Sequence, residues 1–282
     1  MKSEQPVKIG VVITTYNSPV WLRWVLVGYE NQTDQNFVAL IADDGSGEET
    51  QAVIDEFKAR GQLQIEHYWQ EDDGFRKTVI LNKVIAQTDC DYLIFTDGDC
   101  IPRADFIATH RQQAATGTFL SGGYIKLTMP VSESVTEADI ASGHIFNKAE
   151  LVRRGQPATF KLTKLTTNAF LRSALNALTP TKATWNGMNS SGWIKDIRAV
   201  NGFDERMQYG GLDRELGERL WNSGVRSKQI RYSAVCLHLD HARGYAKPEI
   251  WEKNHRIRAE VKKGRIAWTP YGIQKDGDQH GA

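Results

Sequence analysis

Short apolar runs alternate with helix-like stretches over the first 120 residues, and this alternation constrains the fold more than any other feature of the sequence. The apolar runs cover 9–14, 37–42, 63–68 and 92–96, and the helix-like stretches cover 19–29, 48–60, 76–87 and 103–116. Strands and helices that alternate at this spacing are joined by right-handed crossovers and form a parallel sheet. We therefore expect an α/β fold with a mostly parallel, Rossmann-like sheet flanked by helices. Its ligands should bind at the carboxyl ends of the strands.

The pattern loosens after residue 128, where apolar positions continue at helical spacing. Between 148 and 182, seven Lys or Arg residues stand against Glu150 alone. We expect a helical insertion that packs on the sheet with a solvated basic face, or one that contacts an acceptor or an anionic membrane. A helix over 210–224 and a strand over 231–239 are predicted further on. The chain accordingly divides into 1–128, 129–184, 185–242 and a basic extension over 243–282.

The composition is that of an ordinary globular protein and excludes several functional classes. The 35 Lys and Arg residues balance 34 Asp and Glu residues, which gives no support to a nucleic-acid-binding function. The three cysteines are too few and too scattered for a disulfide framework or a zinc cluster. The sequence shows no signal-peptide pattern and no apolar run of the roughly 18–20 residues that a membrane-spanning helix needs. We expect a cytoplasmic protein with reduced thiols.

Two carboxylates follow the fourth apolar run, as Asp97 and Asp99 with Gly98 between them. The glycine lets the backbone turn tightly, so that both side chains of this D-x-D motif can address one ligand. Mg²⁺ and Mn²⁺ take oxygen ligands and keep positions open for substrate phosphates. The motif therefore predicts a site for a diphosphate and a metal ion at the end of this strand. An ordinary acidic turn is the alternative.

Further motifs accompany the D-x-D motif, and together they carry a family resemblance. Thr14-Thr15-Tyr16-Asn17 ends the first strand, and Ala42-Asp43-Asp44-Gly45-Ser46 ends the second. With the D-x-D motif, they resemble the family 2 glycosyltransferases, whose nucleotide-sugar-binding fold is called GT-A. Residues 201–205 (NGFDE) and 210–216 (GGLDREL) resemble the C-terminal module of galactosyltransferases and N-acetylgalactosaminyltransferases. The resemblance covers roughly 8–128 and 185–242.

The resemblance implies which residues hold the nucleotide. The residues implied for the base, the ribose and the phosphates are Thr15, Tyr16, Asp43, Asp44, Arg76 and Asp97. A carboxylate oxygen can accept a hydrogen bond from uracil or from a ribose hydroxyl, and a guanidinium suits a phosphate. The alternatives are strand-end capping for the first four residues and a plain surface position for Arg76.

The resemblance also implies the metal ligands. Asp99 is implied as a direct ligand of Mn²⁺ or Mg²⁺, and Asp97 as a further candidate. A histidine after the helix of the catalytic base is the second ligand, and either His238 or His241 could serve. We prefer His238, because it lies at the end of its own predicted strand. A purely structural histidine is the alternative for each.

Asp213 is implied as the catalytic base, which takes the proton from the acceptor hydroxyl. It begins a predicted helix after two glycines, where the helix dipole keeps a carboxylate ionised. The alternative is a helix cap, and Glu215 is a second candidate base. Leu212 stands where the family has an acidic residue. For the acceptor side, the sequence predicts Trp185, Asn186 and Trp193. The rings of the two tryptophans could stack on sugars or pack in the core.

The resemblance implies a metal-dependent, inverting glycosyltransferase that uses a nucleotide-diphosphate sugar, most simply a UDP-hexose or UDP-N-acetylhexosamine. The acceptor would be a surface glycan such as lipopolysaccharide, O-antigen or capsule. A lipid-linked acceptor would explain the basic segments, by docking the protein on the anionic inner membrane. Two alternatives stay open: a sugar nucleotidyltransferase, and a non-catalytic protein that binds nucleotide sugars or glycans.

Overall fold

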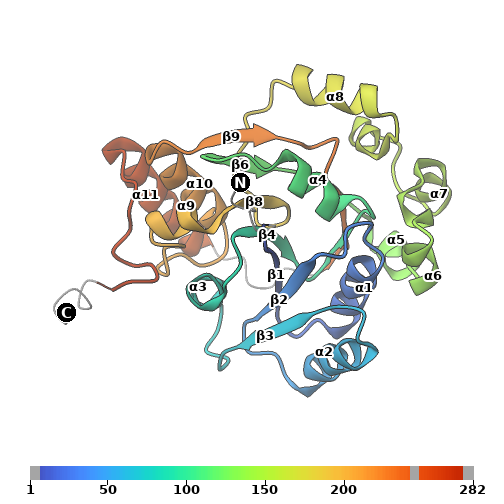
Figure 1. Ribbon diagram of the computed structural model, residues 1–282, viewed down its shortest axis with the longest axis horizontal. Coiled ribbons are helices and arrows are strands. Elements are labelled where there is room, and N and C mark those ends of the chain that lie inside the picture. The colour runs from blue at the N-terminus through green and yellow to red at the C-terminus, as the bar shows by residue number, and fades with distance from the viewer. Residues whose placement is uncertain (1–6, 242–247, 276–282) are drawn as a thin grey trace, which may run out of the picture.

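The computed structural model describes residues 7–241 and 248–275, which are built around a central sheet (Figure 1). The described strands, in their order across this sheet, are β3 (Ile65–Trp69), β2 (Phe37–Asp43), β1 (Ile9–Thr15), β4 (Tyr92–Asp97), β8 (Ser190–Trp193), β6 (Thr118–Ser121) and β9 (Arg226–Gln229). The first four strands are parallel, and β8 runs antiparallel to both of its neighbours. The predicted α/β fold with a mostly parallel sheet is confirmed.

A smaller sheet lies beside the end of β4. It consists of β5 (Cys100–Pro102), β10 (Val235–His238) and β7 (Gly123–Lys126), with β10 in the centre. The antiparallel register of β10 on β5 places His238 opposite Cys100. Because Cys100 follows the D-x-D motif directly, this small sheet carries His238 from a distant part of the sequence to Asp99.

Helices cover both faces of the central sheet, which explains the nearly continuous apolar runs of β1 and β2. One face packs against α1 (Pro19–Glu30), α2 (Glu48–Arg60) and α4 (Phe106–Gln113). The other packs against α3 (Lys77–Gln87), α9 (Ile194–Ala199) and α10 (Leu212–Asn222). The helix α11 (Pro248–Gly264) packs on the outside of α10 through Ile257.

The boundaries of several predicted elements differ from the structure, and two of them differ by three residues or more at least at one end. The helix expected over 103–116 begins only at Phe106, because Arg103 continues from β5 and its backbone N–H donates to Val235 O at 3.1 Å. The strand expected over 231–239 begins at Val235, because Ala234 N donates to Ile230 O and closes a turn there. The helix over 48–60 has the predicted bounds and ends at Gly61, whose φ of 67° suits glycine.

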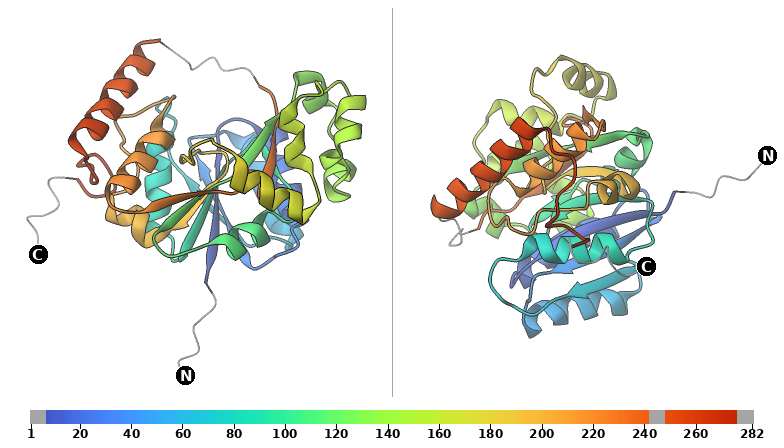
Figure 2. Two further views of the ribbon diagram at one scale, coloured as in Figure 1. Left: turned by 90° about the horizontal axis from the view of Figure 1, so that it is seen from above. Right: turned by 90° about the vertical axis from the view of Figure 1, so that its left-hand side faces the viewer.

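The segment between β7 and β8 is largely helical. Its elements are α5 (Met129–Glu133), α6 (Glu137–Ala141), a 3₁₀ turn η1 (His144–Phe146), α7 (Lys148–Arg153), a 3₁₀ turn η2 (Phe160–Leu165) and α8 (Ala169–Leu178). Val131, Ile140 and Leu151 join the core that α1 forms, whereas α8 has no buried residue. In Figure 2 these helices lie at one side of the molecule, and α10 and α11 lie at the other.

Each of the three cysteines is free and buried. Among the helices that the structure describes, none combines the length and the apolar character needed to cross a bilayer.

Candidate active site

A cavity of about 1380 Å³ opens at the carboxyl ends of the parallel strands. The ends of β1 and β4, the start of α3, the loop before α10 and the insertion all contribute to its lining. Most of the sequence-predicted residues border it: Thr15, Tyr16, Asp44, Asp97, Asp99, Trp185, Asn186, Asp213, His238 and His241. The sheet therefore brings together residues from four separate parts of the sequence.

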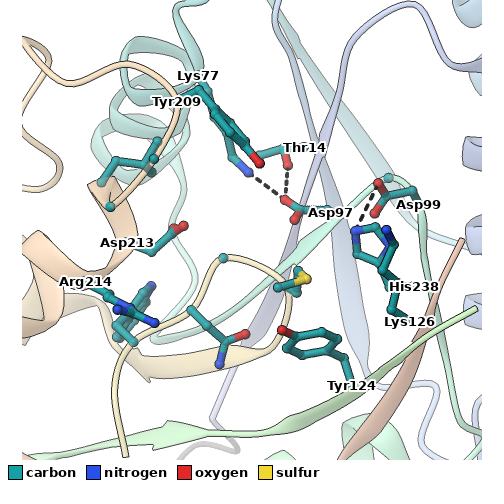
Figure 3. Close-up of a pocket in the computed structure, with 18 of the residues that line it drawn as sticks. Thr14, Lys77, Asp97, Asp99, Tyr124, Lys126, Tyr209, Asp213, Arg214 and His238 are labelled. Atoms are coloured by element: carbon teal, nitrogen blue, oxygen red, sulfur yellow. Dashed lines mark hydrogen bonds and ion pairs between the residues drawn. The ribbon is translucent and has the colours of Figure 1, made fainter. Parts of the chain in front are cut away.

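Asp97 is held by two neighbours at the end of β4. The parallel register sets Thr14 beside Asp97, and the Thr14 hydroxyl donates to Asp97 Oδ1 at 2.8 Å. Lys77 Nζ donates to the same oxygen at 2.5 Å (Figure 3). Although burial opposes the charge of Lys77, the carboxylates of Asp97 and Asp213 raise its pKa above the ordinary value. The site thus contains a firmly protonated, partly buried ammonium group.

Lys77 lines the cavity but was missed by the sequence analysis, which predicted Arg76 beside it instead. The Arg76 guanidinium does not line the cavity and lies 3.4 Å from Asp73 on the surface. The helix α3 begins at Lys77, so the change of one residue turns the side chain from solvent into the cavity. A cation in the first turn of a helix is unfavourable next to the helix dipole. This unfavourable position was the feature of the sequence that could have indicated Lys77.

The two carboxylates at the end of β2, Asp43 and Asp44, lie in different surroundings. Asp44 lines the cavity and accepts hydrogen bonds from the Arg76 backbone N–H at 2.9 Å and from Gln70. Burial raises its pKa, and these two hydrogen bonds oppose the shift. Asp43 does not line the cavity: it accepts from the Ser46 backbone N–H and faces His67 Nε2 at 3.1 Å. The prediction of a nucleotide contact was therefore wrong for Asp43, which caps its strand end.

Asp99 lies beside both candidate histidines. His241 Nε2 is 2.9 Å from Asp99 Oδ2, and His238 Nε2 is 3.6 Å from the same atom. The two imidazole rings stack with their centroids 5.6 Å apart. Burial opposes ionisation of Asp99, but the hydrogen bond from His241 and the charges of both histidines hold its pKa below the ordinary value. The structure therefore brings both histidines to the same carboxylate.

This cluster fits a divalent transition-metal ion. It offers one carboxylate from the turn between β4 and β5 and two imidazoles from the end of β10 and the loop after it. Mixed oxygen and nitrogen ligands suit Mn²⁺. His238 Nδ1 is buried and has no hydrogen-bond partner among the described residues. Cys100 also lies within the group, but burial raises the pKa of its thiol well above the ordinary value. In this structure the Cys100 thiol donates to Asp99 Oδ1 at 3.3 Å.

Asp213 points into the cavity from the side opposite Asp97 and Asp99 (Figure 3). It lies in the first turn of α10, where Gly211 at φ 86° is the cap, so the cap alternative does not hold for Asp213. A Cβ atom at position 187 would lie 2.7 Å from Asp213 Oδ1, and only glycine permits this approach. Burial raises the pKa of Asp213 to about 6; Lys77 opposes this shift and Asp97 adds to it. The carboxyl group thus titrates near neutral pH.

Glu215, the second candidate base, faces the core. Arg219 donates to it at 2.6 Å, and both side chains are fully buried. Arg219 also donates to the backbone oxygens of Val200 and Gly202, which anchors α10 to the preceding loop. This buried pair positions the helix that carries Asp213 and has no access to the cavity.

Of the residues predicted for the acceptor side, Trp185 and Asn186 border the cavity, whereas Trp193 does not. Asn186 lines the cavity and donates to Asn189 O at 3.0 Å. Trp185 has no exposed surface, because its ring packs between Phe95 and Phe119, and it cannot stack on a sugar. Trp193 pairs with Tyr92 at the start of β4, the end of the sheet remote from the cavity. Both stacking assignments were wrong.

Several solved structures share this architecture at low sequence identity. The GalNAc-T7 structure with UDP, GalNAc and Mn²⁺ gives a TM-score of 0.61 at 13% identity, over 92% of this chain and 48% of that one. The S. aureus TarS 1–349 complex with UDP-GlcNAc gives 0.60 at 14% identity, over 92% and 69%. The Pyrobaculum calidifontis mannosyltransferase PcManGT with GDP-Man and Mn²⁺ gives 0.56 at 15%, over 93% and 63%. These likenesses show that the chain has the GT-A fold.

Sequence comparison finds a family model that matches part of the chain. Residues 10–124 match the model of glycosyl transferase family 2. The chain is also 29% identical over 99 residues to the hyaluronan synthase of Pasteurella multocida, a match that covers 35% of this chain but only 10% of that protein. The part of the chain over residues 10–124 is thus similar to glycosyl transferase family 2, and the curated relative is matched over only a tenth of its own length.

Proposed function

We propose that the protein is a metal-dependent, inverting glycosyltransferase that moves a hexose or N-acetylhexosamine from a UDP-sugar to a hydroxyl group of a surface glycan. One observation carries the proposal: Asp213, with its pKa near 6, shares a single cavity with the Asp99–His238–His241 cluster. A carboxylate base and a cluster for a divalent cation at opposite sides of one cavity are what a single displacement on a sugar diphosphate requires.

The chemistry assigned to Asp213 follows from its environment. The acceptor hydroxyl attacks the anomeric carbon while its proton passes to Asp213, and the bond from that carbon to the diphosphate oxygen breaks. The electron pair of the broken bond leaves with the nucleoside diphosphate. Because attack and departure occur on opposite faces of the sugar, the anomeric configuration inverts. A pKa near 6 leaves the base ionised at neutral pH and basic enough to accept the proton.

The leaving group requires positive charge. A divalent metal ion held by Asp99, His238 and His241 would supply Lewis-acid stabilisation of the departing diphosphate. Lys77 holds Asp97 in place, and its ammonium adds a fixed positive charge to the same wall of the cavity. On the nucleotide side, Thr15, Tyr16 and Asp44 supply the polar groups for the base and the ribose.

The proposal of a UDP-sugar donor rests on the family resemblance and on the solved relatives. TarS has been crystallised with UDP-GlcNAc, and GalNAc-T7 with UDP, GalNAc and Mn²⁺, whereas PcManGT was crystallised with GDP-Man and Mn²⁺. The decisive experiment is UDP release from UDP-glucose, UDP-galactose, UDP-GlcNAc and UDP-GalNAc, with Mn²⁺ and then with EDTA. We expect Mn²⁺-dependent release from at least one donor, and no release from any donor would contradict the proposal.

We further propose that the protein docks on an anionic membrane that carries a lipid-linked acceptor. The helix α8 supports this, because it exposes Phe170 to 84% and Leu178 to 79%. Phe160 in the neighbouring turn η2 is 72% exposed. Exposed aromatic and aliphatic side chains near Lys161 and other cations suit the interface of an anionic bilayer.

Sedimentation with vesicles tests this docking. Vesicles that contain phosphatidylglycerol should bind the protein, vesicles of phosphatidylcholine alone should bind it weakly, and added salt should release it. Phe170→Ser with Leu178→Ser should abolish binding, whereas Ile266→Ser, an exposed residue in another region, should not. Membrane docking would be refuted if the amount of protein bound to the vesicles did not change with lipid charge, with salt or with the α8 substitutions.

A further inference from the structure

Four cations line the wall of the cavity that the insertion and its neighbours form. Lys161 and Lys164 belong to η2, Lys182 lies between α8 and β8, and Arg231 lies in the turn before β10. They come from three separate segments of the chain, so their proximity is a property of the fold and not of one basic run. The carboxylates that line the cavity, by contrast, belong to the strand ends and to α10.

These cations lack the carboxylate partners that neutralise other basic residues of the insertion. Arg154, for example, pairs with both Asp139 and Glu150. Lys164 instead donates to the backbone oxygen of Tyr124 at 2.9 Å, and Arg231 donates to that of Lys182 at 3.1 Å. Within the part of the chain that the structure describes, neither forms an ion pair.

Lys164 and Arg231 are also partly removed from water, which makes their uncompensated charge costly. Burial lowers the pKa of Lys164, and the positive charges of Arg231 and Lys161 lower it further. Burial likewise lowers the pKa of Arg231, with only Tyr124 and Tyr232 acting in the opposite direction. An anion bound between these side chains would relieve both the repulsion and the loss of solvation.

Tyr124 stands between this cluster and the proposed metal centre. Lys164 Nζ lies 5.5 Å from the centroid of the Tyr124 ring, which in turn lies 6.4 Å from that of His238. Tyr124 is 37% exposed and points into the cavity (Figure 3). Lys164 and Arg231, with Lys161 close to Lys164, therefore flank the site of transfer beyond Tyr124, where an acceptor would extend from its attacked hydroxyl. The Lys182 ammonium instead lies 5.1 Å from the centroid of the Trp221 ring.

We infer that Lys161, Lys164 and Arg231 form an oxyanion subsite, so that the acceptor is an acidic glycan with a carboxylate or phosphate near the attacked hydroxyl. This inference rests on the proposed glycosyl transfer and names the class of its acceptor. Lysine and arginine bind either oxyanion through charge-assisted hydrogen bonds. A uronic acid and a sugar phosphate are thus two sources of the same chemistry.

Calorimetric titration of matched probes tests the subsite. The probes are hexagalacturonate, its uncharged methyl ester and a glycerol-phosphate oligomer, each titrated in the presence of Mn²⁺ and UDP. We expect at least one acidic probe to bind, the ester to bind at least about tenfold more weakly, and salt to weaken the acidic probe. The stronger of the two acidic probes identifies the source of the oxyanion.

Variants separate this subsite from the donor site. Lys164→Gln and Arg231→Gln should each weaken the acidic probe about tenfold while UDP affinity is unchanged. Lys164→Arg should keep most of the affinity, and Lys58→Gln, an exposed cation on α2, serves as the matched control. Equal binding of acid and ester, no binding of either acidic probe, or a loss of UDP affinity in Lys164→Gln would each overturn the inference. Failure of the proposed function is seen separately, as absent UDP binding by the wild-type protein.

Discussion

Replacement of Asp213 by asparagine should strongly lower the rate of transfer and at the same time stabilise the protein. The pKa of Asp213 is raised from an ordinary value of 3.8 to about 6, chiefly by burial. The native carboxyl group therefore holds its proton more tightly than the unfolded chain does, and its ionisation lowers the free energy of unfolding as pH rises from about 4 to 6. A shift of about two pH units corresponds to about 3 kcal/mol above pH 6.

Asparagine has nearly the same shape and carries no charge, so Asp213→Asn should raise the free energy of unfolding by up to about 3 kcal/mol at pH 7.5. The gain should shrink as the pH falls to 4, where the aspartate is itself protonated. Loss of a general base should lower turnover by about 10²–10⁴-fold, with UDP affinity nearly unchanged. The ionised Asp213 carboxylate thus lowers the free energy of unfolding, and the proposed reaction requires this ionised form.

The assay combines urea denaturation at pH 4 and pH 7.5 with UDP-sugar turnover. Asp55→Asn removes an exposed carboxylate on α2 and should change neither quantity. An Asp213→Asn protein with wild-type turnover would refute the assignment of the base. A variant that is no more stable than the wild type at pH 7.5 would refute the argument from burial.

Three further predictions follow from the same site. Transfer should fall as the pH is lowered through about 6, because protonation of Asp213 removes the base; a pH–rate profile without an acidic limb near this value would contradict this. Gly187→Ala should lower turnover more than UDP affinity, since its Cβ would lie 2.7 Å from Asp213 Oδ1; kinetics with unchanged kcat would count against this contact. Arg219→Met should lower the free energy of unfolding by about 3–5 kcal/mol, because Glu215 is left buried and unpaired, and urea denaturation measures this loss.

The strand ends were predictable from sequence because they depend on local patterns. A buried apolar run followed by Asp97 and Asp99 fixes where those side chains emerge, and parallel strands end at one edge of the sheet. Asp213 was identified through the resemblance of residues 210–216 to the C-terminal module of galactosyltransferases, because a helix start after two glycines does not by itself indicate a base. These residues meet in one cavity because the fold class itself brings such ends together.

The positions of the other site residues depend on contacts between distant segments of the chain, which local sequence patterns do not encode. Trp193 follows the segment of Asn186 closely in sequence, but β8 runs antiparallel to β4 and carries it to the far end of the sheet. Lys77, and not the predicted Arg76, lines the cavity, because the start of α3 determines which of the two side chains points inward. The choice between His238 and His241 was open, since only the folded chain brings both to Asp99.

The central claim is a metal-dependent site for a nucleotide diphosphate, and calorimetric titration of UDP tests it most directly. The titration is made with Mn²⁺ and then with EDTA, on the wild type and on Asp99→Ala, with circular dichroism to establish that the variant is folded. We expect UDP to bind the wild type with Mn²⁺, and to bind weakly or not at all with EDTA or to the folded variant. UDP affinity that is the same in all of these conditions, or no binding by the wild type with Mn²⁺, would contradict the account.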